Sequence, residues 1–155
     1  MPARMKNPGM LIPEATEPSQ QLWAAAHKGG VSGKVLGLVH LRVSQINGCS
    51  FCVDSARPQE GAPGMGDTIE RLFAVAAWHE SPYFSDAERA ALALAESVTR
   101  IADQPDPVPD AIWDEAAKHY DEKGLAALLI AIATVNAWNR FNVAVRQPAG
   151  EVSWH

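Results

Sequence analysis

The sequence predicts an all-α protein built as a single domain over residues 1–155. Five or six stretches repeat apolar residues at helical spacing, no stretch alternates with a period of two, and alanine is frequent throughout the chain. A chain of 155 residues suits one compact domain, and a hydrophobic content of 47% is sufficient for a substantial core. Disordered and fibrous classes are therefore excluded.

The first elements are delimited by residues that stop a helix. Residues 1–18 contain four prolines and mixed charges, and we expect them to form an extended N-terminal arm. A first helix is predicted over Ser19–Lys28 because Gly29-Gly30 follows it, and a second over Gly33–Ile46. Asn47-Gly48 ends the second helix, since both residues tolerate the left-handed conformation.

Two cysteines follow this stop directly. We expect Cys49 and Cys52 in the first turn of a new helix, one turn apart and on the same face. Residues 57–66 hold two prolines and three glycines, which the interior of a helix would not accept. This segment is predicted to be an irregular loop.

The second half of the chain alternates helices with short connections. A fourth helix is predicted from Asp67 or Thr68 to about Trp78. The next begins with the capping box Ser85-Asp86-Ala87-Glu88 and continues to about Ala102.

The last two helices follow a connector rich in proline, Asp103–Pro109. A short amphipathic helix is expected over Asp110–His119 and a long one over Asp121–Val145. Because the long helix is apolar nearly all round from Leu125 to Ala137, we expect it to be the central buried helix or a subunit contact.

Charge and hydropathy exclude several partners. Thirteen Lys and Arg against eighteen Asp and Glu leave a net charge of −5 without a basic cluster, so we expect no nucleic-acid partner. The longest unbroken apolar run, Leu125–Ala133, is far shorter than the roughly 20 residues of a membrane span. Residues 1–18 lack an apolar block followed by a cleavage site, so we expect a cytoplasmic protein.

The CxxC pair favours redox chemistry. Two cysteines at this spacing do not form a disulfide framework, and no second CxxC or HxxxH is present to complete a zinc site. At the start of a helix, free N–H groups and the helix dipole lower a thiol pKa below about 8.5. One sulfur can then attack a peroxide or disulfide while the other resolves the product. The alternative is two buried, unreactive thiols.

Leu41–Cys52, LRVSQINGCSFC, followed by Val53-Asp54, resembles the signature of the alkylhydroperoxidase D-like and carboxymuconolactone decarboxylase families. Asn136–Arg140, NAWNR, in the last helix resembles a second family motif. The resemblance implies a bundle of six to seven helices that forms homo-trimers or hexamers. It also implies that Cys52 attacks the peroxide, that Cys49 resolves it, and that an external thiol or dihydrolipoyl protein supplies the electrons. No bound cofactor or metal is expected.

The sequence departs from the family pattern around the cysteines. The glutamate of the family falls on Gly37 and its histidine on Ala56, so the usual proton relay is absent. We expect these small residues to widen a pocket that Phe51, Asp54 and Ser55 also line. His40 lies one turn after Gly37 and is either the replacement base or a histidine of the core or of a subunit interface.

Three functions follow. The first is a thiol-dependent, peroxidase-like oxidoreductase that the missing relay weakens or redirects. The second is a repurposed or engineered small-molecule pocket on the same scaffold, with non-redox chemistry that uses His40 or a single thiol. The third is an inert oligomeric scaffold.

Overall fold

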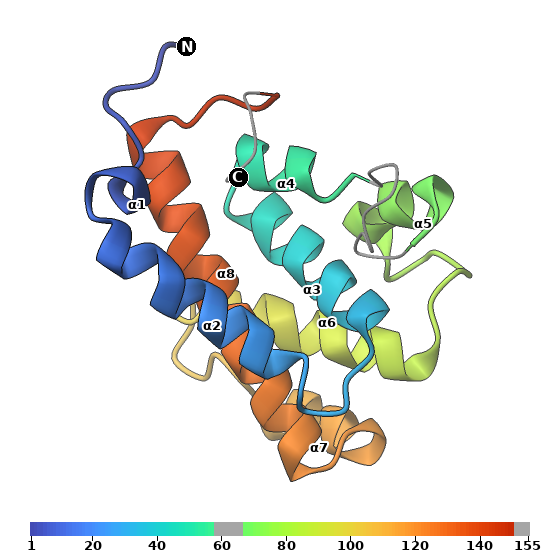
Figure 1. The fold of residues 1–155 in the computed structure, drawn as a ribbon. Coiled ribbons are helices and arrows are strands. Elements are labelled where there is room, and N and C mark those ends of the chain that lie inside the picture. The colour runs from blue at the N-terminus through green and yellow to red at the C-terminus, as the bar shows by residue number, and fades with distance from the viewer. Residues whose placement is uncertain (58–66, 151–155) are drawn as a thin grey trace.

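The computed structural model describes residues 1–57 and 67–150, and every regular element within these ranges is helical (Figure 1). The all-α prediction is confirmed. The predicted irregular loop over 57–66 lies outside the described residues from position 58 onward. In chain order the elements are α1 (Pro8–Leu11), η1 (Pro13–Ala15), α2 (Thr16–Ala26), α3 (Gly33–Ile46), α4 (Ser50–Ser55), α5 (Ile69–Ala74), η2 (Val75–Ala77), α6 (Asp86–Thr99), α7 (Asp110–His119) and α8 (Glu122–Val145).

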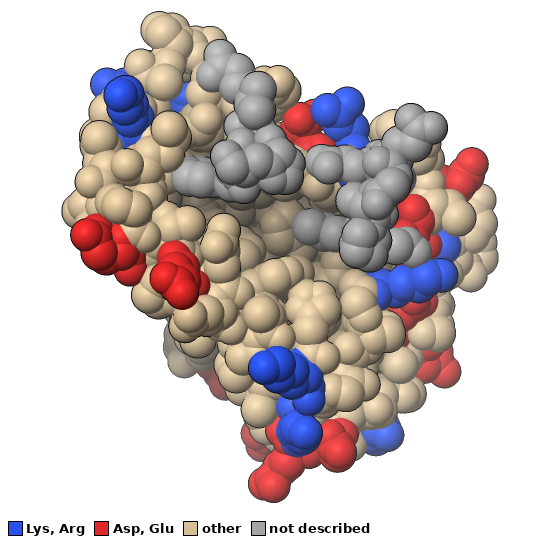
Figure 2. Space-filling model, viewed as in Figure 1, with Lys and Arg blue, Asp and Glu red and all other residues tan. Residues whose placement is uncertain are grey.

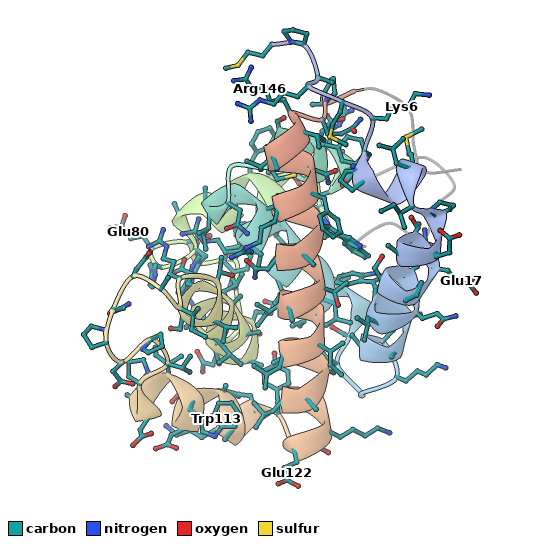
Figure 3. All side chains as sticks on the ribbon, turned by 90° about the vertical axis from the view of Figure 1, so that its left-hand side faces the viewer. Lys6, Glu17, Glu80, Trp113, Glu122 and Arg146 are labelled. Atoms are coloured by element: carbon teal, nitrogen blue, oxygen red, sulfur yellow. The ribbon has the colours of Figure 1, made fainter. Side chains whose placement is uncertain are left out.

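Helix α8 is the centre of the bundle. It packs against α2, α3 and α6, and Figure 3 shows it running the height of the molecule with α2 on one side and α6 and α7 on the other. By length and composition α8 would also be apolar enough to cross a membrane, with a mean hydropathy of 1.3 over 18 residues. Half of that window is buried inside the bundle, as is typical of a core helix. The predicted central role of this helix is confirmed.

Helix α3 is enclosed on both sides. One apolar cluster joins α3 to α2, α6 and α8 and includes Leu36, Val39 and Leu128. A second cluster joins the opposite face of α3 to the segment around η2 and includes Leu38 and Trp78. Because neighbours cover both faces, α3 holds the cysteine segment at its C-terminal end in a rigid frame.

The expected extended arm over residues 1–18 is wrong for its second half. Helix α1 begins at Pro8, η1 begins at Pro13, and α2 begins at Thr16 with Pro18 in its first turn. These prolines lie in the first turns of helices, where the missing N–H has no intrahelical partner to lose. They start helices here and do not prevent them.

Other boundaries moved by a few residues. The predicted helix from Asp67 or Thr68 to Trp78 is divided into α5 and η2, with Thr68 as the N-cap. The capping box is confirmed, because the Ser85 hydroxyl accepts from the Glu88 N–H and the Glu88 carboxylate accepts from the Ser85 N–H. Helix α6 ends at Thr99 instead of Ala102.

The N-terminal segment is attached to the C-terminal half of α8. The Arg4 N–H donates to the Val145 carbonyl at 2.9 Å, and the Trp138 indole N–H donates to the Ser19 hydroxyl at 3.0 Å. Both termini of the described chain therefore lie at the same end of the bundle (Figure 1). On the face in Figure 2, charged side chains form small separate groups on a largely uncharged surface.

Leu128→Ala should destabilise the fold strongly, because Leu128 is fully buried at the centre of α8. We expect the free energy of unfolding to fall by about 2–5 kcal/mol in urea denaturation, from lost apolar burial and the cavity left behind. Leu129→Ala, at a half-buried neighbour, is the matched control and should cost clearly less. Equal losses at the two positions would contradict the central placement of α8.

Candidate functional site

The two cysteines lie at the start of α4, directly after the turn that ends α3. Gly48 adopts a φ of +66°, which reverses the chain between the two helices. Cys49 is the N-cap of α4, and its Sγ accepts a hydrogen bond from the Cys52 N–H at 3.3 Å. Both thiols are free and buried, with 1% of Cys49 and 3% of Cys52 exposed.

Polar side chains from α3 and α8 surround the Cys52 sulfur. The Asn142 Nδ2 donates to Cys52 Sγ at 3.2 Å. Asn139 donates to the Ser44 hydroxyl at 3.1 Å, and hydrogen bonding from both of these side chains also favours the thiolate of Cys52. A buried thiolate has no water to stabilise it, so these hydrogen-bond donors take the place of water and allow Cys52 to ionise.

Ionisation is divided unequally between the two thiols. The Cys49 S–H donates to the Cys52 sulfur, and with Asn142 this outweighs the opposing effect of burial and lowers the pKa of Cys52 to about 7. The pKa of Cys49 is raised, first because its proton is held in that hydrogen bond and then because it is buried. The first ionisation of the pair therefore falls on Cys52, while Cys49 keeps its proton.

The asparagines around the site form a stripe along α8. Asn136, Asn139 and Asn142 are spaced three residues apart on one face of the helix. Asn47, which ends α3, donates to the Oδ1 atoms of both Asn136 and Asn139 at 2.9 Å. The stripe thus connects the α3 turn, the cysteine segment and α8 through satisfied amide groups.

His40 is a buried residue of α3 that packs against an aromatic ring. Its ring lies edge-on against Trp23 of α2, with centroids 5.8 Å apart, and no hydrogen bond within the described residues joins it to either cysteine. Its Nδ1 is buried without a partner, and burial lowers the pKa of His40 to about 4. With so low a pKa the imidazole is a weak base, and it has no hydrogen bond to the thiols, so the contacts do not favour His40 as the base.

The remaining predicted pocket residues differ in burial. Gly37 is buried in α3, and Ala56 is buried in the apolar cluster with Leu38 and Trp78. Phe51 is half-buried at the start of α4.

Asp54 and Ser55 stabilise the local backbone. The Asp54 carboxylate pairs with Arg57 at 2.9 Å and accepts from the Gly150 N–H at 3.1 Å. The Ser55 hydroxyl donates to the Cys52 carbonyl at 2.8 Å. Their contacts therefore hold α4 and the chain after α8, and neither residue bonds to a cysteine sulfur.

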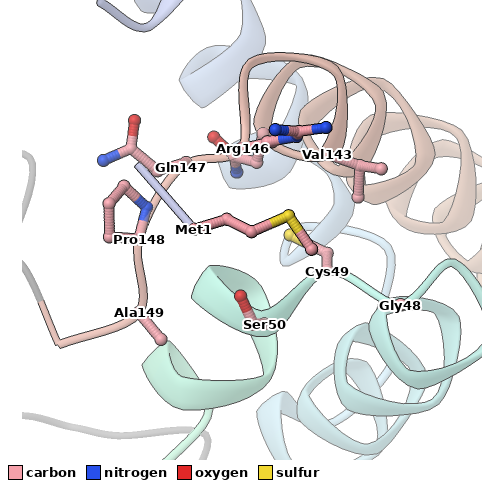
Figure 4. Close-up of a pocket in the computed structure, with 10 residues that line it drawn as sticks. Met1, Gly48, Cys49, Ser50, Val143, Arg146, Gln147, Pro148 and Ala149 are labelled. Carbon is pink, nitrogen blue, oxygen red and sulfur yellow. The ribbon is translucent and has the colours of Figure 1, made fainter. Parts of the chain in front are cut away.

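A cavity of about 450 Å³ opens beside the site, between the start of α4 and the end of α8 (Figure 4). Of the two thiols, Cys49 is the one that lines it. Asn142 lies in the same wall, so the cavity reaches both the protonated thiol and the amide that contacts Cys52. The other lining residues are Met1, Gly48, Ser50, Val143, Arg146, Gln147, Pro148 and Ala149.

Sequence reasoning missed Asn142 and Asn7 as site residues. Asn142 lies just beyond the NAWNR motif, and its signal is the recurrence of asparagine every third position in an otherwise apolar helix. Asn7 lies in the segment expected to be extended, and no local pattern in the sequence indicates it. Within residues 1–57 and 67–150, no group of three or more His, Cys, Asp or Glu could hold a metal ion.

The chain is similar to proteins of known sequence and structure. Residues 13–97 match the carboxymuconolactone decarboxylase family. The uncharacterised protein YdfG of Bacillus subtilis is 33% identical over 135 residues, which cover 87% of this chain and 89% of that protein. The uncharacterised protein YnjA of Escherichia coli is 36% identical over 127 residues, which cover 82% of this chain and 67% of that protein.

Solved structures share the fold. A protein of unknown function from Agrobacterium tumefaciens, with a suggested identity as the antioxidant defence protein AhpD, has a TM-score of 0.82 at 28% identity. The match covers 97% of this chain and all of that one. The debrominase Bmp8 has a TM-score of 0.72 at 20% identity. The match covers 90% of this chain and 73% of the Bmp8 chain, and at this identity it supports a shared fold alone.

The reduced protein should show one thiolate with a midpoint near pH 7. We expect absorbance at 240 nm to rise in a first step near that pH, since the donors around Cys52 stabilise its charge. Cys52→Ser should remove this step, and Cys49→Ala should move it to higher pH by deleting the S–H donor. Survival of the step in Cys52→Ser would assign the thiolate to Cys49 instead.

Stability should fall in mild acid because of His40. Its folded pKa of about 4 lies below the ordinary 6.5, so between these values the unfolded chain binds more protons and unfolding becomes easier as pH falls. The effect amounts to about 3 kcal/mol over the window. His40→Leu should flatten the urea-derived profile between pH 6.5 and 4. An unchanged profile in a folded His40→Leu variant would contradict this assignment.

Proposed function

Because the chain belongs to the carboxymuconolactone decarboxylase family, we propose that it is a dithiol peroxidase of the alkylhydroperoxidase D type. The observation that carries the proposal is the state of the Cys52 sulfur. Its pKa is about 7, it accepts a hydrogen bond from Asn142, and a protonated second thiol lies next to it. An ionised sulfur beside a protonated one is the arrangement that peroxide reduction by a dithiol requires.

The reaction balances within the pair. The Cys52 thiolate attacks one oxygen of ROOH, the O–O bond breaks, and the departing alkoxide takes the Cys49 proton to leave as ROH. Cys52 is now a sulfenic acid and Cys49 a thiolate. Cys49 then attacks the Cys52 sulfur, forms the disulfide and releases hydroxide, which a proton from the buffer converts to water.

The proton supply makes this peroxidase slow. Gly37 and Ala56 replace the glutamate and histidine of the family relay, and Ala56 lies in an apolar cluster without a proton to offer. The Cys49 S–H is then the nearest proton donor. Loss of positioned acid–base help typically costs about 10²–10⁴-fold in rate, and we expect turnover reduced to that extent.

Electrons return through the cavity beside Cys49. An external thiol, or a dithiol of the dihydrolipoyl type, attacks the Cys49 sulfur of the disulfide from this side. The bond to Cys52 breaks, and Cys52 leaves as the thiolate that its surroundings stabilise. A second thiol of the reductant then releases Cys49 and restores the pair.

A non-redox pocket that uses His40 or one thiol is the second candidate. The contacts of His40 offer it less support, since the ring packs on Trp23 and is not hydrogen-bonded to the site. The two candidates differ in their need for the second thiol, because only the redox cycle uses Cys49 to form a disulfide.

Peroxide consumption in the presence of excess dihydrolipoamide should depend on both cysteines. We expect Cys52→Ser to lose turnover entirely, because the attacking sulfur is gone. Cys49→Ser should complete at most one turnover and accumulate sulfenic acid detectable by mass spectrometry. Wild-type turnover no faster than that of Cys52→Ser would contradict the proposal. Sustained turnover by Cys49→Ser would favour the single-thiol alternative.

The double variant Gly37→Glu/Ala56→His tests the missing relay. With the relay restored we expect a gain of about 10²-fold or more in peroxide turnover. The melting temperature is recorded alongside, since both positions are buried. In a folded double variant, unchanged turnover would contradict the view that proton supply limits the rate.

A further inference from the structure

One residue of the N-terminal segment is buried against the site. Asn7 is 3% exposed, although residues 1–6 before it are all exposed. Its Nδ2 donates to the Asn142 Oδ1 at 2.6 Å, and its own Oδ1 accepts from the Gly9 N–H at 3.0 Å. Asn142 in turn donates to Cys52 Sγ, so a chain of three hydrogen bonds runs from a backbone N–H to the sulfur.

The direction of this chain is set at its far end. An amide side chain can present either its oxygen or its nitrogen to a neighbour, and only a partner of fixed polarity decides which. The Gly9 N–H can only donate, so it holds the Asn7 oxygen and leaves the Asn7 NH₂ for Asn142. The Asn142 oxygen must then face Asn7, and its NH₂ must face the sulfur.

We propose that Asn7 is a positioning residue that fixes Asn142 as a hydrogen-bond donor to Cys52. Without it, rotation of the Asn142 amide by 180° would point a carbonyl oxygen at the sulfur, where it would repel a thiolate. The inference rests on the proposed function only in taking Cys52 as the attacking thiol. By this role of Asn7, the N-terminal segment before α2 is a functional part of the site.

Other contacts hold Asn7 in place. The Arg4 N–H bonds to the Val145 carbonyl at the end of α8, three residues beyond Asn142. On the other side, the Thr16 hydroxyl donates to the Gly9 carbonyl at 2.8 Å. The segment is thus fastened both to α8 and to α2, with Asn7 between the two attachments.

The choice of an amide follows from the two tasks of this side chain. Capping the Gly9 N–H needs an acceptor, which aspartate would supply equally well. Holding the Asn142 oxygen needs a donor, which an ionised aspartate lacks. Asn7→Asp therefore preserves the shape and the cap while it reverses the polarity toward Asn142.

Alkylation of the reduced full-length protein by iodoacetamide, followed at Cys52 by mass spectrometry across pH 5–10, tests the inference. We expect Asn7→Asp to raise the midpoint of the rate profile by about one pH unit, which lowers the rate at pH 7 about five-fold. Asn7→Ala, which frees the Asn142 amide without reversing it, should shift the midpoint less and in the same direction. A midpoint unchanged in a folded Asn7→Asp would overturn the proposal.

A double-variant cycle separates positioning from the new charge. If Asn7 acts through Asn142, the shift caused by Asn7→Asp should disappear in an Asn142→Leu background. A shift of the same size there would assign the effect to the aspartate charge and overturn the proposal.

Ser19→Ala is the control for general loosening. It removes the hydrogen bond between Trp138 of α8 and Ser19 of α2, to which the N-terminal segment is fastened, without touching the chain of amides. Its midpoint should therefore match the wild type. An equal shift in Ser19→Ala would also overturn the proposal. Because alkylation needs no peroxide, these results stand apart from the peroxidase assay, and either inference can fail alone.

Discussion

The hydrogen-bonded asparagines of α8 are the constraint on which the arrangement of the site depends. A buried amide without partners costs on the order of 1–3 kcal/mol, so the buried Asn139 and Asn142 must each meet a matching group. The half-buried Asn136 is paired as well. Their partners come from Asn47, Ser44, Asn7 and Cys52, which lie on different segments of the chain. The helix can therefore adopt only the rotation and height at which all of these bonds form together.

This stripe explains how an almost wholly apolar helix holds a polar site. Apolar burial against α2, α3 and α6 stabilises α8, but apolar contacts tolerate small shifts along the helix axis. The amide hydrogen bonds do not tolerate such shifts, because a hydrogen bond weakens steeply as its distance and angle depart from the ideal. Packing thus supplies the stability of the bundle, and the stripe sets the position of the Cys52 sulfur within it.

The cysteine pair shows how one environment separates two identical side chains. Cys49 caps α4 and keeps its proton, whereas Cys52 receives donors from Cys49 and Asn142. Spacing alone would make the two thiols equivalent members of one helical turn. Their division into a thiolate and a proton donor comes first from the hydrogen bond between the two sulfurs and then from the donors of α8. The cavity adds a second difference, since Cys49 is the thiol that lines it.

The sequence by itself determined the helical fold, the central place of α8, the capping box at Ser85 and the location of the cysteines after the α3 stop, because each depends on residues close together in the chain. Only the tertiary structure decided that Asn142 contacts both Asn7 and Cys52, and that His40 is buried against Trp23 without a hydrogen bond to either thiol. Asn7 and Asn142 are separated by 135 positions. No local pattern can report such a contact, which exists because the N-terminal segment folds back along α8.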